Sequence, residues 1–170
     1  MAKPREEQYE VIDREEAPEI YALLDHVIET DREELRGMRI VLCWRIGWKA
    51  DRDGHLMLGK ASIVSELDNK LCGGWDGKIL LNFEAWQELT EQQRAALLDH
   101  ETRHFAPKLD KDGDHCEDVN GRKLWRMVRH DLEEFIGTYR LYGAWRPNIE
   151  TFVGALNDSR RPLLKMVSGQ

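Results

Sequence analysis

Two histidines, His100 and His104, stand four residues apart in the sequence HETRH, and Glu101 lies between them. On a helix, residues four apart lie one above the other, so both imidazoles could bind one metal ion. Zinc lowers the pKa of the water that it binds, and a neighbouring carboxylate can take a proton as that water attacks a peptide carbonyl. The pattern predicts His100 and His104 as zinc ligands. It predicts Glu101 as the general base, which also returns the proton to the leaving amine.

The surroundings of this motif decide how much weight it carries. A short pattern can arise by chance. The alternative to a metal site is a pair of histidines that are exposed, or hydrogen-bonded within the core, beside a surface glutamate. Thr90 and Gln93 form the pattern of a capping box, which predicts a helix from Glu91 through His104 that ends before Pro107. A capped helix with apolar residues before the motif favours the metal site.

A catalytic zinc usually has three protein ligands and one open position. The third candidate is His130 in the sequence HDLEEF, on a helix expected over Val128–Tyr142, with Glu134 one turn later on the same face. This spacing suits a ligand, His130, with Glu134 and Asp131 as partners that orient it. Glu134 as a direct ligand is the alternative. Weaker candidates are His115, Asp131 and Glu133, and the segment could also be a solvated helix start.

The oxyanion of a hydrolytic transition state needs a stabilising group. Tyr139, Tyr142 and Arg129 are near the third-ligand candidate in the sequence, although Tyr139 is expected in the core.

Length and composition limit the classes of protein that the chain could represent. Its 170 residues, 41% hydrophobic and 34% charged, predict a single domain over residues 1–170, with flexible ends at 1–8 and about 160–170. A net charge of −7 argues against general binding to nucleic acid or to an anionic membrane. The N-terminus lacks the pattern of a signal peptide, and Cys43, Cys72 and Cys116 form no CxxC pair, so a cytoplasmic protein is expected.

The remaining pattern predicts an α+β fold. A small curved sheet would be packed by an N-terminal helix and the HETRH helix, and the HDLEEF helix would complete the site. The apolar strand 78–83 is expected at the sheet edge beside the HETRH helix, and residues 56–71 are ambiguous between strand and helix. The other expected elements are a helix at 17–36, a strand at 38–48, a turn at 51–54 and a loop or short hairpin at 108–123.

Three segments together resemble the putative phage metallopeptidase family, small zincin-like proteins of phages and prophages. They are GKASIVSEL (59–67), LNFEAWQELTEQQRAALLDHETRH (81–104) and RHDLEEFIGTYRLYGAW (129–145). The resemblance implies a zincin fold, zinc on His100 and His104, Glu101 as the base, a further ligand at His130 and a protein that works inside a bacterium. Thr102 and Arg103 depart from the family's usual leucine and cysteine, and Arg103 would weaken zinc binding if it faced the site.

We therefore expect a zinc-dependent peptidase that acts on a protein or peptide substrate. One alternative is a zinc-bearing or metal-free binding module that sequesters a host protein or an assembly partner. Another is a DNA-linked protease resembling the repair zincins. It would need a basic patch, for which the chain offers the modest cluster of Arg122, Lys123, Arg126 and Arg129.

Overall fold

The computed structural model describes residues 8–133 and 136–158. The chain divides between Val128 and Arg129 into two compact units, and each is described by itself. The ends that were predicted to be flexible lie almost entirely outside the described residues. The prediction of one domain over residues 1–170 stays a prediction.

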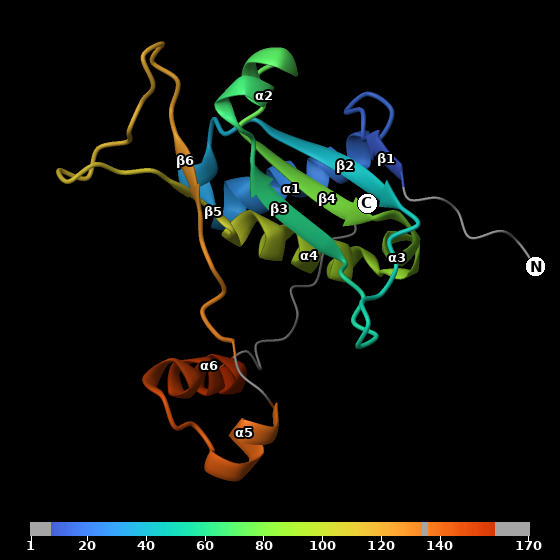
Figure 1. Cartoon of the computed structure of the whole chain (residues 1–170), viewed down its shortest axis with the longest axis vertical. Helices are drawn as coiled ribbons and strands as arrows, with labels where there is room; N and C mark the ends of the chain where they lie inside the picture. The colour runs from blue at the N-terminus through green and yellow to red at the C-terminus, as the bar shows by residue number, and fades with distance from the viewer. Residues whose placement is uncertain (1–7, 134–135, 159–170) are drawn as a thin grey trace, which may run out of the picture. The chain divides into compact units, whose positions relative to one another are not determined.

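The fold is α+β, as predicted (Figure 1). Among the described residues, no helix is long and apolar enough to cross a membrane. The strands and helices of the first unit are β1 Gln8–Val11, α1 Pro18–Asp31, β2 Ile40–Ile46, β3 Gly59–Ile63, α2 Glu66–Leu71, β4 Gly77–Asn82, α3 Phe83–Glu88, α4 Glu91–Arg103, β5 Phe105–Pro107 and β6 Trp125–Met127, with a 3-10 turn at Glu33–Leu35. The second unit contains α5 Ile136–Tyr142 and α6 Pro147–Asp158.

Four strands form a mixed sheet in the order β1-β2-β4-β3, with β2 and β4 parallel and the other neighbours antiparallel. The prediction that the 78–83 strand forms the sheet edge is wrong, because β4 lies between β2 and β3. Ile79 and Leu81 are fully buried on the face that carries the core, whereas Lys78 on the other face is exposed. β4 is an interior strand because it pairs with β2 on one side and with β3 on the other. The edge strand next to α4 is β3.

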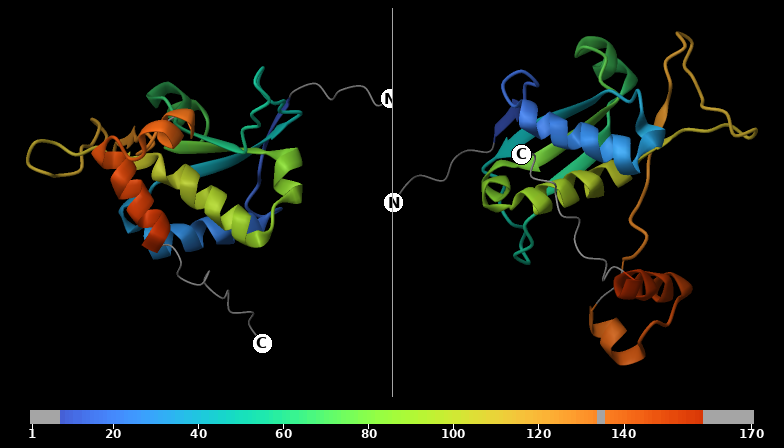
Figure 2. Two further views of the ribbon diagram at one scale, coloured as in Figure 1. Left: turned by 90° about the horizontal axis from the view of Figure 1, so that it is seen from below. Right: turned by 180° about the vertical axis from the view of Figure 1, so that it is seen from behind.

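Two helices, α1 and α4, lie side by side on one face of the sheet (Figures 1 and 2). The strand register brings Leu42, Ile79 and Ala61 into line across β2, β4 and β3, and all three are buried in the common core. Leu24 of α1 and Leu98 of α4 belong to the same core. Period-2 alternation in the strands and helical spacing in the helices therefore meet in one apolar layer.

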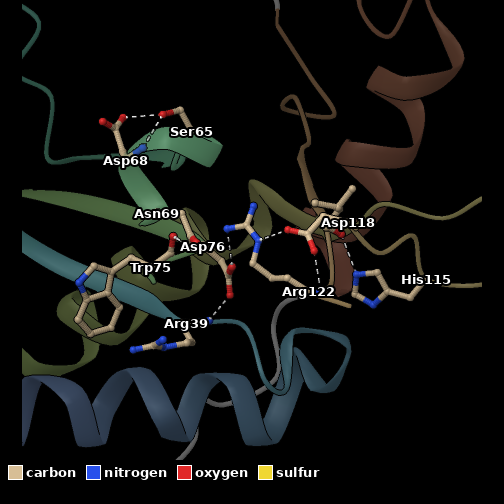
Figure 3. Close-up of polar contacts among 10 residues, drawn as sticks. Arg39, Ser65, Asp68, Asn69, Trp75, Asp76, His115, Asp118 and Arg122 are labelled. Atoms are coloured by element: carbon tan, nitrogen blue, oxygen red, sulfur yellow. Dashed lines mark hydrogen bonds and ion pairs between the residues drawn. The ribbon is translucent and has the colours of Figure 1, made fainter. Parts of the chain in front are cut away.

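The segment after α4 is a β hairpin, which confirms the prediction for residues 108–123. β5 pairs with β6, and between them two isolated bridges, Leu109 with His115 and Glu117 with Lys123, each close a short turn. Near the end of the 108–123 segment, the guanidinium of Arg122 lies 3.5 Å from the carboxylates of both Asp76 and Asp118 (Figure 3). Asp76 also accepts a hydrogen bond from the N–H of Arg39. One cation of the predicted basic cluster is thus paired with carboxylates.

Of the helix predicted over Val128–Tyr142, the structure describes α5 over Ile136–Tyr142, and residues 129–133 are irregular. A helix from Val128 would need its carbonyl to accept from residue 132, but that carbonyl lies 2.8 Å from Nδ1 of His104. Tyr139 is 41% exposed, contrary to the prediction that it belongs to the core. The sequence analysis also missed α6, although Pro147 is a typical first helical residue.

Candidate active site

The helix that carries the HETRH sequence starts where predicted. The Thr90 hydroxyl accepts from the N–H of Gln93 at 3.3 Å, and the Gln93 side chain accepts from the N–H of Thr90 at 2.9 Å. This reciprocal capping box begins α4 at Glu91, and the helix ends with His104 as its C-cap. Both histidines and Glu101 therefore lie on or directly after one capped helix.

The rings of His100 and His104 are neighbours at the end of α4. Their centroids lie 5.3 Å apart at an interplanar angle of 82°, and a nitrogen of each ring lies within 4.8 Å of the other. Two nitrogens that bind one zinc ion at about 2.0–2.1 Å lie within about 4.2 Å of each other. Small ring rotations would thus bring both imidazoles to one ion, so the pair fits a metal such as zinc.

Val128 holds the ring of His104 in a definite orientation. The backbone N–H of Val128 donates to the carbonyl of His104 at 2.8 Å, and Nδ1 of His104 lies 2.8 Å from the Val128 carbonyl oxygen. A carbonyl can only accept, so Nδ1 carries the hydrogen in this pair. In the neutral ring the lone pair is then on Nε2, which is the form that a metal ligand needs.

Glu101 is only 4% exposed and lies against the edge strand β3. Its Oε2 accepts a hydrogen bond from the N–H of Ala61 at 2.8 Å. Burial raises the pKa of the Glu101 carboxyl above its ordinary value, against the opposing effects of a charged His104 and of the Ala61 hydrogen bond. This carboxyl is therefore held in a fixed place in surroundings that favour its proton-bound form.

Arg103 faces away from the histidine pair. Its guanidinium makes a bidentate ion pair with Asp99, in which Nε and Nη2 donate to the two carboxylate oxygens at 2.8 Å and 3.0 Å. The Arg103 side chain is 60% exposed. Thr102 is fully buried, and its hydroxyl donates to the carbonyl of Asp99. The departure from the family pattern at position 103 thus places its charge in solvent, where it has little effect on a metal.

A cleft of about 470 Å³ opens beside Glu101 and His100. One wall is the face of α4, and the opposite wall is the chain that leads into β3. The lining residues are Met57, Leu58, Gly59, Leu89, Gln93, Ala96, Leu97, His100 and Glu101. In the first unit, the candidate catalytic residues therefore lie beside a space that could hold a ligand.

Comparison with known families gives one match. The model of the family described as Putative phage metallopeptidase matches residues 12–157, which include all of the site described above. The chain belongs to this family. Comparisons with curated proteins and with solved structures found no match. The family's description implies a metal, and the imidazole pair of α4 supplies donors that suit one.

The structure brings together three residues of the predicted site, His100, Glu101 and His104, in the first unit. His130 and Asp131 belong to the second unit, so their predicted roles stay predictions. The same holds for Arg129, Tyr139 and Tyr142 as candidates for the oxyanion. Glu134 lies outside the described residues.

Two weaker ligand candidates have other contacts. Nε2 of His115 lies 2.7 Å from the carbonyl oxygen of Leu124, and its ring packs edge to face on Trp125 at 4.7 Å. These contacts serve the hairpin. The backbone carbonyl of Glu133 accepts from Arg146 at 3.1 Å within the second unit.

The sequence analysis missed the contribution of the strand that faces α4. Ala61 donates to Glu101, and a Cβ at Gly59 would lie 2.6 Å from Oε1 of Glu101. Both residues belong to GKASIVSEL, one of the segments that resembles the family. The signal was therefore present, but strand and helix are paired by tertiary packing that residue spacing does not encode.

Proposed function

We propose that this protein is a zinc-dependent peptidase in which His100, His104 and His130 hold the ion and Glu101 is the general base. The observation that carries the proposal is the arrangement on α4, where two imidazoles with nitrogens within 4.8 Å of each other flank a buried, oriented carboxyl. A bound zinc ion would supply a Lewis acid that makes water and a peptide carbonyl more reactive.

Glu101 would carry the proton in this reaction. Its carboxylate takes a proton from the attacking water and gives it to the nitrogen of the leaving amine. The Ala61 N–H fixes one oxygen, Oε2, at 2.8 Å, and the other, Oε1, lies beside Gly59, which lines the same cleft as His100. Burial of the carboxyl, which raises its pKa, makes it a stronger base once it is ionised.

Chain connectivity supports His130 as the third ligand. Val128 is tied to His104 by two hydrogen bonds of 2.8 Å. Consecutive Cα atoms are about 3.8 Å apart, so the Cα of His130 lies within about 7.6 Å of that of Val128 in any arrangement of the second unit. An imidazole two residues from this anchor is within reach of an ion on His104. Asp131 would orient that ring, and Glu134 is the alternative ligand or a further orienting group.

The decisive experiment is Glu101→Gln in the full chain, with zinc content and peptide cleavage measured on the same sample. Gln preserves the size of the side chain and its acceptor for the Ala61 N–H, but it cannot act as a base. We expect zinc content to be unchanged and cleavage of unfolded casein to fall at least about 100-fold. His26→Ala on the exposed face of α1 is the control and should change neither quantity.

Three outcomes would each contradict part of the proposal. Cleavage at the wild-type rate by the Glu101→Gln protein would remove Glu101 as the base. A wild-type protein that binds zinc and cleaves no peptide would favour the alternative of a zinc-bearing binding module. Retention of zinc by both His130→Ala and Glu134→Ala would contradict the third-ligand assignment.

A further inference from the structure

We infer that the cleft beside Glu101 is the substrate's side-chain pocket, and that it selects a large apolar residue, such as Leu, Met or Phe, adjacent to the cleaved bond. The inference rests on the proposed function and names its substrate class. It comes from the composition of the cleft, its position on α4 and the exposure of one of its walls.

One wall of the cleft is one face of α4. Gln93, Ala96, Leu97, His100 and Glu101 follow one another at spacings of three, one, three and one, which is the pattern of a single helix face. Ala96 stands four residues before His100 and therefore directly beneath it. A side chain in the cleft would lie against the same face that carries the candidate base and ligand.

The opposite wall is an apolar segment that is left in solvent. Met57 is 49% exposed and Leu58 is 39% exposed, and both line the cleft; the neighbouring Leu56 is 47% exposed. Exposure of large apolar side chains to water is unfavourable in free energy. A run of such residues is typical of a surface that binds another molecule. The backbone of this wall is fixed, because the carbonyls of Met57 and Leu58 accept from the side chain and the N–H of Asn82.

The charges around the cleft favour an uncharged occupant. Its lining in the described part of the chain contains no Lys, Arg or Asp, and its single carboxylate is Glu101 at the end next to His100. A buried charge without a partner is costly, so Asp or Lys side chains would be rejected by these walls. Leu58, Leu89 and Leu97 would gain contact with an apolar side chain.

The position of the pocket limits where the selected residue stands. Glu101 belongs both to the pocket and to the proposed proton transfer, so the cleaved bond must pass beside it. A cleft of about 470 Å³ accommodates one large side chain with room for its backbone. The selected residue is therefore one of the two that share the cleaved bond.

The test uses blocked pentapeptides that differ only at the central residue, which is Leu, Met, Phe, Ala, Asp or Lys. Zinc-loaded wild-type protein is assayed for cleavage, and zinc-loaded Glu101→Gln protein is assayed for binding by equilibrium dialysis. We expect Leu, Met and Phe to be preferred over Asp and Lys by about 10-fold or more in both assays. The cut should fall directly before or directly after the central residue.

Three variants probe the walls. Ala96→Trp fills the cleft and should remove the preference, whereas Gln92→Trp adds the same ring at an exposed position of α4 outside the lining and should preserve it. Leu58→Asp puts a carboxylate in the wall and should shift the preference toward Lys. Wild-type preference in both Ala96→Trp and Leu58→Asp would overturn the pocket assignment.

The outcomes separate this inference from the proposed function. Cleavage of all peptides at equal rates would overturn the pocket and leave the peptidase standing. Absence of cleavage, with apolar preference in binding that Ala96→Trp removes, would support the pocket and overturn the peptidase. Absence of both cleavage and discrimination would overturn both.

Discussion

Gly59 of β3 and Glu101 of α4 meet so closely that a Cβ at position 59 would lie 2.6 Å from Oε1 and 2.9 Å from Cδ of the glutamate. The atoms that would have to move belong to the Glu101 side chain and not to a backbone, so the strand itself can accept alanine. We predict that Gly59→Ala folds normally but displaces the Glu101 carboxyl from the Ala61 N–H. Cleavage should fall by about 10–100-fold, because small displacements of a catalytic group are costly.

Zinc content and thermal unfolding of the Gly59→Ala protein should match the wild type, and both are measured alongside cleavage. Gly154→Ala is the matched control, since a Cβ there meets no atom within 4 Å. It lies on α6, where alanine is a better helix former than glycine, so stability should be equal or slightly higher. Wild-type cleavage by Gly59→Ala would show that the position of the carboxyl is unimportant.

This contact also marks the limit of what the sequence could predict. Local signals sufficed for α4: the Thr90–Gln93 box fixed its start, and spacing of four brought His100 and His104 together. Nothing in the spacing of residues 59–61 indicated that their strand would form the edge beside α4. The apolar run at residues 78–83 predicts an edge strand, but pairing with a strand on each side makes β4 an interior one.

The prediction of a helix start at HDLEEF is wrong for residues 130–133, and the reason is related. The residues of this segment favour the start of a helix, but the carbonyl of Val128 is taken by a tertiary contact with His104. A long-range hydrogen bond of this kind overrides local propensity and is invisible in the sequence. The geometric argument that paired His130 with Glu134 on one helix face is therefore weakened, while the short distance along the chain from Val128 to His130 remains.

Tyr21 links three parts of the first unit. The side chain is 3% exposed, and its hydroxyl donates to the carbonyl of Ile12 at 2.9 Å and accepts from the N–H of Leu42 at 3.2 Å. Tyr21→Phe removes both hydrogen bonds in a buried place, so we predict a loss of about 1–3 kcal/mol in the free energy of unfolding. Urea unfolding provides the measurement. Tyr9→Phe, at a side chain that is 62% exposed, should be neutral, and equal effects of the two changes would contradict this account.

Metal binding should be visible as stability. A ligand that binds only the folded state stabilises it, by about 2.7 kcal/mol when its concentration is 100 times the Kd. We predict that zinc raises the thermal midpoint of the wild type and that a chelator reverses the shift. The zinc-induced shift should vanish in His100→Ala, whose exposed ring makes it a mild structural change.

His55→Ala is the control for that experiment. His55 belongs to a second group of potential ligands with Asp51 and Asp53, and all three are exposed. One oxygen of Asp51 already accepts from the N–H groups of Asp53 and His55, as in an ordinary turn. The shift should therefore persist in His55→Ala, and its loss there would move the metal to this turn.

The contacts of Asp118 indicate how the turn closed by Glu117 and Lys123 responds to acid. Oδ1 of Asp118 accepts from the N–H groups of Asn120 and Arg122, at 2.8 Å and 3.0 Å (Figure 3 shows Asp118 beside Arg122). The bond from Arg122, followed by that from Asn120, lowers the pKa of the Asp118 carboxyl. A carboxyl with a lowered pKa in the folded state stabilises the fold above its unfolded pKa of about 3.9. That stabilisation is lost as the pH falls through the lower folded value.

Asp118→Asn keeps an oxygen that can accept both N–H groups but removes the charge. We predict that the variant has a lower thermal midpoint than the wild type at neutral pH, and that the difference disappears once the pH is below the folded pKa of Asp118. Asp112→Asn, at an exposed position in the other turn between β5 and β6, should show a smaller difference at neutral pH. A difference for Asp118→Asn that persists unchanged in strong acid would show that the charge contributes nothing and that the hairpin is held by its neutral contacts.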